Sequence, residues 1–105
     1  MGSVIKVMIV DDSLFFREML SAKLASYSNL EVVATPADPY DAADKIKKYK
    51  PDVLTCDIEM PKMNGIEFIR QLMPQYPIPV VVVSSVSNVV FKALHAGAVD
   101  FIAKP

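Results

Sequence analysis

The chain has 105 residues, of which 52% are hydrophobic and 22% are charged, and its formal net charge at pH 7 is −1. This length suits one domain, and the apolar content is too high for a disordered chain. The charge balance, without a basic run, argues against nucleic acid and anionic membranes as partners, and the apolar runs are too short to span a bilayer.

In chain order, short apolar runs rich in β-branched residues alternate with segments of helical spacing. The apolar runs predict strands over 4–10, 30–35, 53–56, 79–84 and 99–103. The segments between them predict helices over 13–27, 38–50, 65–73 and 88–97. Asp38 followed by Pro39 marks a helix start, Asp12 or Ser13 can cap the first helix, and Gly97 marks a helix end.

Single helices between consecutive strands dictate how the strands can pair. Such strands must run parallel, with right-handed crossovers that place helices on both faces of the sheet. We therefore expect one α/β domain over 1–105, built as a doubly wound five-stranded parallel sheet.

The glycines and the single cysteine narrow the function. Gly2, Gly65 and Gly97 are scattered along the chain. Dinucleotide-binding fingerprints and P-loops need clustered glycines so that the backbone can approach phosphate closely, so we expect neither kind of site. The N-terminal segment has no signal-peptide pattern. Cys56 cannot form an internal disulfide and fits a reducing compartment, so we expect a cytoplasmic protein.

Polar side chains follow four of the predicted strands. Asp11 and Asp12 come after the first strand, Asp57 after the third, Ser84 and Ser85 at the end of the fourth, and Lys104 after the fifth. Of the two serines, Ser84 at the strand end is the better placed hydroxyl, and Ser85 is expected to line the loop. The carboxyl ends of parallel strands lie along one edge of the sheet, where ligands bind. We therefore expect three carboxylates, a hydroxyl and an ammonium to meet there.

This combination of groups predicts phosphoryl chemistry. Neighbouring carboxylates in a crevice repel one another, and Mg²⁺ with all-oxygen ligation would offset the repulsion. A metal and one lysine can neutralise charge on a transferred phosphoryl group, and a carboxylate can accept that group covalently as an acyl phosphate.

Four motifs in register carry a family resemblance. They are "VDDS" (10–13), "DIEMPKMNG" (57–65), "VVVVSS" (80–85) and "GAVDFIAKP" (97–105). Together they resemble a response-regulator receiver domain, and most closely the N-terminal receivers of chemotaxis protein-glutamate methylesterases. The resemblance implies a flavodoxin-like sheet with strand order 2-1-3-4-5. It also implies a phosphorylatable switch in a two-component system.

The resemblance assigns the acidic residues. Asp57 would be the phosphoacceptor. Asp12 and Asp57 would bind Mg²⁺ directly, together with the backbone carbonyl of Glu59, and Asp11 would hold a metal-bound water.

The resemblance also assigns a switch. Lys104 would pair with the phosphoryl oxygens, Ser84 would donate its hydroxyl to them, and Phe101 would be the aromatic residue that turns in response. The Lys104–Pro105 peptide would be cis.

The resemblance implies a histidine kinase as phosphodonor and a C-terminal effector or downstream protein, such as a methylesterase. Two features depart from the family pattern. The stretch after Ser85 is shorter by about one helical turn, or about 3.6 residues, and the sequence stops at Pro105, before the fifth helix that the family would have. We therefore expect a fragment with a bare sheet face near Val99 and the 80–83 run, which a second copy could cover as a dimer.

Other interpretations compete with the receiver. Glu59, two residues after Asp57, also suits a Mg²⁺-dependent aspartyl-phosphate hydrolase of the haloacid-dehalogenase type, although that class needs a cap and a longer chain. A flavodoxin-like redox module is a further alternative, although it needs a polar phosphate loop after the first strand. Residue by residue, Phe101 and Cys56 could simply be core, and His95 an exposed helix residue.

Overall fold

A computed structural model describes residues 3–85 and 89–104. These residues form five parallel strands in the order β2-β1-β3-β4-β5, as predicted: β1 Ile5–Val10, β2 Leu30–Ala34, β3 Val53–Cys56, β4 Val80–Ser84 and β5 Asp100–Ala103. The helices between them are α1 Leu14–Ala25, α2 Pro39–Tyr49, α3 Gly65–Leu72 and α4 Val90–Ala96. Each predicted element is present, and most ends move by one or two residues.

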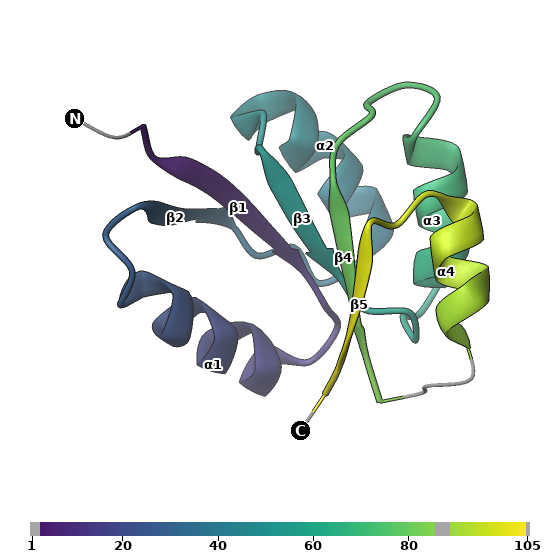
Figure 1. Ribbon diagram of the computed structural model, residues 1–105, viewed down its shortest axis with the longest axis horizontal. Helices are drawn as coiled ribbons and strands as arrows, with labels where there is room; N and C mark the ends of the chain where they lie inside the picture. The colour runs from purple at the N-terminus through teal and green to yellow at the C-terminus, as the bar shows by residue number, and fades with distance from the viewer. Residues whose placement is uncertain (1–2, 86–88, 105) are drawn as a thin grey trace.

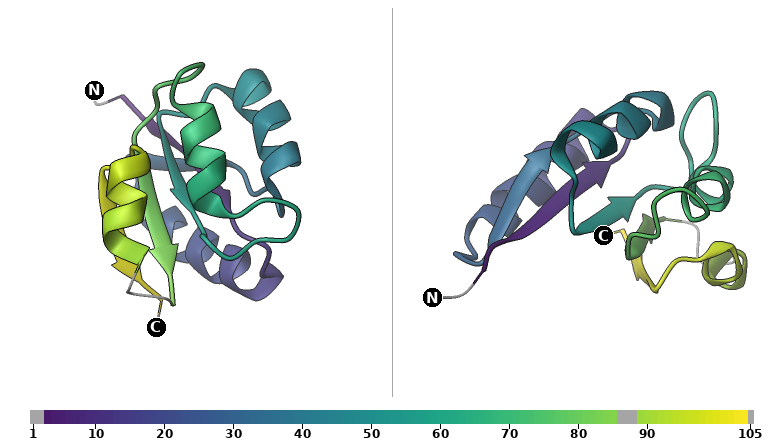
Figure 2. Two further views of the ribbon diagram at one scale, coloured as in Figure 1. Left: turned by 90° about the vertical axis from the view of Figure 1, so that its right-hand side faces the viewer. Right: turned by 90° about the horizontal axis from the view of Figure 1, so that it is seen from above.

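The helices divide unequally between the two faces of the sheet. α1 lies alone on one face, whereas α2, α3 and α4 lie on the other (Figure 1). The two further views show the same two layers on either side of the twisted sheet (Figure 2). The right-handed crossovers expected for parallel strands produce this arrangement.

The main hydrophobic core lies between the sheet and α2–α4. Its strand residues alternate along β1, β3 and β4 and are at most 1% exposed: Met8, Val10, Leu54, Cys56, Val80 and Val82. Ile46 of α2, Ile69 and Leu72 of α3 and Ala93 of α4 close the core from the helix side. The pattern confirms Cys56 as a core residue, and His95 is exposed on α4 as expected.

The face that carries α1 is covered more thinly. None of the described residues of α1 is buried, although Val7 and Ile9 of β1 beneath it are 4% and 0% exposed. Towards the β5 edge, Val99 is 61% and Ile102 is 53% exposed, which confirms the expected bare surface in part.

The expectation of a bare face was wrong for one valine of the 80–83 run. Val83 is only 6% exposed. β4 lies between β3 and β5, and Ile102 sits in register beside Val83. Cross-strand neighbours lie close enough to shield a small side chain.

Local signals fix where the helices start and stop. Ser13, not Asp12, caps α1: its Oγ accepts a hydrogen bond from the Phe16 N–H at 3.2 Å. Asp38 caps α2 by accepting from two backbone N–H groups. Gly97 ends α4 with a φ of 125°, which favours glycine. Within the described part of the chain, α4 is the shortest helix, with seven residues.

Two further expectations concern membranes and the end of the chain. Over residues 3–85 and 89–104, no helix has the length and hydropathy that crossing a bilayer requires. The Lys104–Pro105 peptide, expected to be cis, lies outside the described residues.

Candidate functional site

Three carboxylates meet at the carboxyl edge of the sheet, as predicted. One oxygen each from Asp11, Asp12 and Asp57 lies within 4.8 Å of the others. Asp11 and Asp57 are 1% and 5% exposed, whereas Asp12 faces solvent. The backbone aligns β1 and β3 at this point, because the Asp57 N–H donates to the Val10 carbonyl at 2.9 Å. Residues 46 positions apart are thereby brought into one acidic cluster.

Lys104 reaches the same cluster from the end of β5. Its backbone N–H donates to the Ser84 carbonyl at 3.0 Å, which fixes the start of the side chain. Its Nζ lies 2.8 Å from Asp11 Oδ2 and 3.6 Å from Asp57 Oδ1. The side chain is 18% exposed, so this ion pair is largely shielded from solvent.

The electrostatics single out Asp57 among the titratable groups. The pKa of Asp57 is raised from 3.8 to about 6, chiefly by burial and then by the Asp11 charge, while the Lys104 charge opposes the rise. Burial acts to lower the pKa of Lys104, but Asp11 and Asp57 outweigh burial and raise it. The site therefore disfavours the ionised form of Asp57 and favours the protonated form of Lys104.

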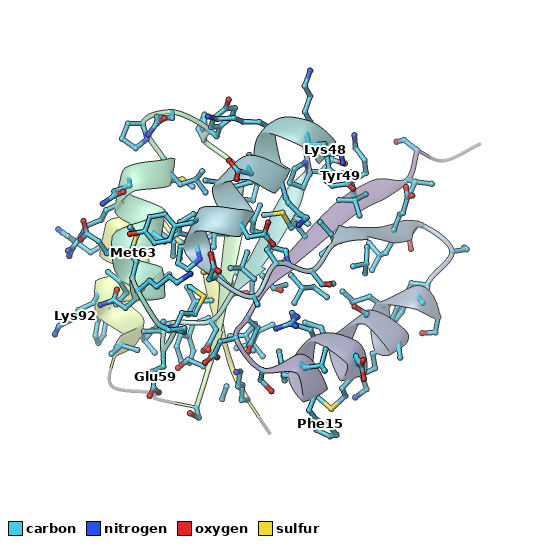
Figure 3. The ribbon with its side chains drawn as sticks, turned by 180° about the vertical axis from the view of Figure 1, so that it is seen from behind. Phe15, Lys48, Tyr49, Glu59, Met63 and Lys92 are labelled. Atoms are coloured by element: carbon cyan, nitrogen blue, oxygen red, sulfur yellow. The ribbon has the colours of Figure 1, made fainter. Side chains whose placement is uncertain are left out.

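The loop after Asp57 is shaped by its backbone. The Glu59 N–H hydrogen-bonds the Asp57 side chain, and the Gly65 N–H donates to the Ile58 carbonyl at 2.7 Å. A Cβ at Gly65 would clash with the backbone carbonyl of Asp57. Glu59 itself projects into solvent at the site end of the molecule, far from Lys48 and Tyr49 at the other end (Figure 3).

The predicted switch residues lie on β4 and β5. Ser84, at the end of β4, is 1% exposed, whereas Ser85 is exposed, which supports the choice of Ser84. Phe101 is half-buried and packs against the main core. Its position therefore suits both interpretations given above, a switch residue and a plain core residue.

Two residues of α1 reach the site that were not predicted from the sequence. The Phe16 ring centroid lies 4.5 Å from Lys104 Nζ. Arg17 Nη1 donates to the Asp11 carbonyl at 2.7 Å. The signal that could have identified them is their place one turn into the helix that follows Asp11 and Asp12.

The donor set matches a hard divalent cation. Three carboxylates face one ammonium, and their oxygens are the ligands that Mg²⁺ prefers. The bonds from Ser13 N–H and Lys104 occupy Asp11, while Asp12 is exposed and accessible. Asp12 and Asp57 could therefore hold such a cation directly.

Comparison with known sequences matches this geometry to a family. A sequence model of the response regulator receiver domain matches residues 7–105. The chain is 60% identical, over 96% of its length, to a protein-glutamate methylesterase/protein-glutamine glutaminase of Syntrophomonas wolfei, and 49% identical, over 98% of its length, to one of Escherichia coli K12. It spans only 30% and 31% of the length of these two relatives.

Solved structures agree with the sequence match. The response regulator domain of Thermotoga maritima CheB superposes with a TM-score of 0.91 at 42% identity, covering 97% of this chain and 79% of that one. A CheX–CheY–BeF3–Mg complex of Borrelia burgdorferi superposes with a TM-score of 0.88 at 33% identity, covering 99% of this chain and 81% of that one. Fold, acidic cluster and sequence thus lead to one conclusion: the chain belongs to the response regulator receiver domain family.

Proposed function

We propose that Asp57 is the phosphoacceptor of this receiver domain. One observation carries the proposal: Asp57 is a buried carboxylate with a raised pKa, 3.6 Å from an ammonium and clustered with two further carboxylates. Asp11 is equally buried, but its oxygens already accept from the Ser13 N–H and pair with Lys104. Asp57 is therefore the better nucleophile.

The proposed reaction is transfer of a phosphoryl group. An Asp57 oxygen attacks phosphorus in the phosphohistidine of a partner kinase, and a P–O bond forms as the P–N bond breaks. The electron pair of the broken bond stays on the imidazole, which takes up a proton from solvent. The Lys104 ammonium neutralises charge on the phosphoryl oxygens, because it already lies between Asp11 and Asp57.

Mg²⁺ is the cofactor that the acidic cluster suits. Asp12, Asp57 and the backbone carbonyl of Glu59 would hold the ion directly, and Asp11 would hold it through a water. A bound Mg²⁺ supplies positive charge that offsets the repulsion among the carboxylates and the charge of the phosphoryl group. The Mg²⁺ named in the CheX–CheY–BeF3–Mg neighbour supports this assignment.

Ser84 and Phe101 form the proposed switch. A phosphoryl group on Asp57 would draw the Ser84 hydroxyl towards it, since hydrogen bonds to charged groups are stronger than neutral ones. The movement vacates space into which Phe101, half-buried on the neighbouring strand, can turn. Ser84→Ala should leave Asp57 phosphorylatable and uncouple Phe101. A fluoroberyllate complex in which Phe101 keeps its rotamer would exclude this switch.

The surrounding system is inferred from the relatives. The chain covers about 30% of a methylesterase relative, so we propose that it is the regulatory part of a longer chemotaxis methylesterase whose phosphodonor is a histidine kinase. The face left thin beside α1, with Val99 and Ile102 exposed, would then be covered by further chain or by a second copy. A cytoplasmic location stays a prediction, supported by the free thiol of Cys56.

Intact mass measurement with acetyl phosphate tests the proposed chemistry. With Mg²⁺, the parent chain should gain the mass of one phosphoryl group, and Asp57→Asn should gain none. Chelation of the metal should abolish the gain. Rapid turnover of acetyl phosphate without a phosphorylated species would favour the hydrolase instead, and no reaction at all would contradict the proposal.

A further inference from the structure

Phe16 places an aromatic ring against the charged groups of the site. It lies in the first turn of α1, and its ring centroid is 4.5 Å from Lys104 Nζ. The backbone at this point is fixed twice: the Phe16 N–H donates to Ser13 Oγ at 3.2 Å, and Arg17 Nη1 donates to the Asp11 carbonyl at 2.7 Å. The ring is thus held in place by the same loop that carries the acidic residues.

Core packing does not account for the position of Phe16. The residue is half-buried and does not belong to the main hydrophobic core, and none of the described residues of α1 is buried. Its neighbour Phe15 is 76% exposed and projects outward from α1 at the edge of the molecule (Figure 3). The two adjacent phenylalanines therefore differ in burial, and Phe16 is the one whose ring faces Lys104.

The contact adds a restraint to a side chain that is already paired with two carboxylates. A lysine ammonium is a compact charge on a four-carbon stem with many rotamers. The negative face of an aromatic ring attracts such a cation, most strongly where water is partly excluded. Lys104 is 18% exposed, so the ring closes one side of the ammonium while its N–H donors remain directed to Asp11 and Asp57.

We propose that Phe16 is a positioning residue for phosphoryl transfer: its ring holds the Lys104 ammonium at the site where charge develops, and so raises the rate constant of Asp57 phosphorylation. The inference rests on the proposed role of Asp57. The ring acts through Lys104, which it contacts at 4.5 Å. A preorganised cation is worth more than one that must be ordered during the reaction.

Phosphorylation by acetyl phosphate with Mg²⁺ provides the test, with the limiting rate constant and the half-saturating concentration measured separately. Phe16→Leu keeps an apolar side chain without a ring, and it should lower the limiting rate constant about three- to tenfold. The half-saturating concentration and the Mg²⁺ affinity from calorimetry should stay as in the parent. Phe16→Tyr should restore the rate, and the matched control Phe15→Leu should leave it unchanged.

Stepwise fluorination of the Phe16 ring separates the electrostatic contact from packing. Fluorine withdraws electron density from the ring face while nearly keeping its shape, so the rate constant should fall progressively with fluorine content. A Phe16→Leu chain that is folded and reacts as fast as the parent, or a fluorinated series with a constant rate, would overturn the inference. If the parent itself acquires no phosphoryl group on Asp57, the proposed function fails instead.

Discussion

The core beneath α2–α4 and the acidic site at the carboxyl edge are built on the same strands but have opposite effects on the stability of the folded state. On β3, Leu54 and Cys56 are fully buried in an apolar cluster. The very next residue, Asp57, is almost as buried but is a carboxylate, and burial raises its pKa to about 6. One step along the chain therefore separates a stabilising burial from a destabilising one.

The difference shows where the domain gains stability and where it gives some up. Apolar burial contributes roughly 25 cal/mol per Å² removed from water, and in the core both strand and helix side chains contribute to this stabilisation. The site keeps three carboxylates together with one ammonium, and their mutual repulsion disfavours the folded state when no cation offsets it. Substitutions in the two regions should therefore change the free energy of unfolding with opposite signs.

The largest effect should come from the core. Leu54→Ala removes a side chain that is 0% exposed, so it should lower the free energy of unfolding by about 2–5 kcal/mol, through lost burial and a cavity. Chemical denaturation measures this. Ile102→Ala is the matched control, since Ile102 is 53% exposed; equal losses for the two variants would contradict the division into a packed core and a thin face.

The next largest effect should be an increase in the free energy of unfolding when Asp57→Asn is compared with the parent in the absence of metal. The folded-state pKa of Asp57 is raised from 3.8 to about 6, so ionisation destabilises the folded parent as the pH rises through this range. At pH 7 the variant should be more stable than the parent by about 1–3 kcal/mol, and below about pH 4 the advantage should disappear. Denaturation in chelator across this range tests it, with exposed Asp44→Asn as control; a pH-independent difference would exclude the linkage.

A smaller gain should follow from Asp12→Ala. Asp12 is exposed, so removing its charge relieves less repulsion than changing Asp57 does. The variant should nevertheless lose the extra stability that Mg²⁺ gives the parent, because a ligand stabilises only the state that binds it. Denaturation with and without Mg²⁺ gives both values. A variant that is less stable without metal, or that still gains from Mg²⁺ as the parent does, would show that the metal site is misassigned.

The smallest change in the free energy of unfolding should come from the β5 edge of the sheet face that carries α1, where Val99 and Ile102 are exposed. Ile102→Ser exchanges a half-exposed apolar side chain for a polar one and removes part of the cover over Val83, so it should lower the free energy of unfolding by about 1 kcal/mol at most. If a second copy covers this face, the parent should have the solution mass of a dimer, and the Ile102→Ser variant should have a lower mass, closer to that of a monomer. A loss of several kcal/mol in a monomer would mean that the face is covered by residues of its own chain.

Sequence reasoning reached the fold and the cluster because both depend on periodic or topological rules. Alternating strands and helices dictate a parallel sheet, and this alone brings Asp11 and Asp57 to one edge. Side-chain contacts follow no such rule. The stacking of Phe16 on Lys104 depends on how α1 leaves the sheet, and the cover over Val83 depends on its neighbours across two strands. Hydrophobic periodicity cannot distinguish either residue from ordinary core.

The position of the phosphoryl group is the most direct test of the account. After reaction with acetyl phosphate and Mg²⁺, borohydride reduces an aspartyl phosphate to homoserine, which remains in the chain and can be located by fragmentation mass spectrometry. We expect homoserine at position 57 and unchanged aspartate at positions 11 and 12. Homoserine at either of those positions, or a phosphorylated chain in which Asp57 stays intact, would contradict the assignment of Asp57 as the phosphoacceptor.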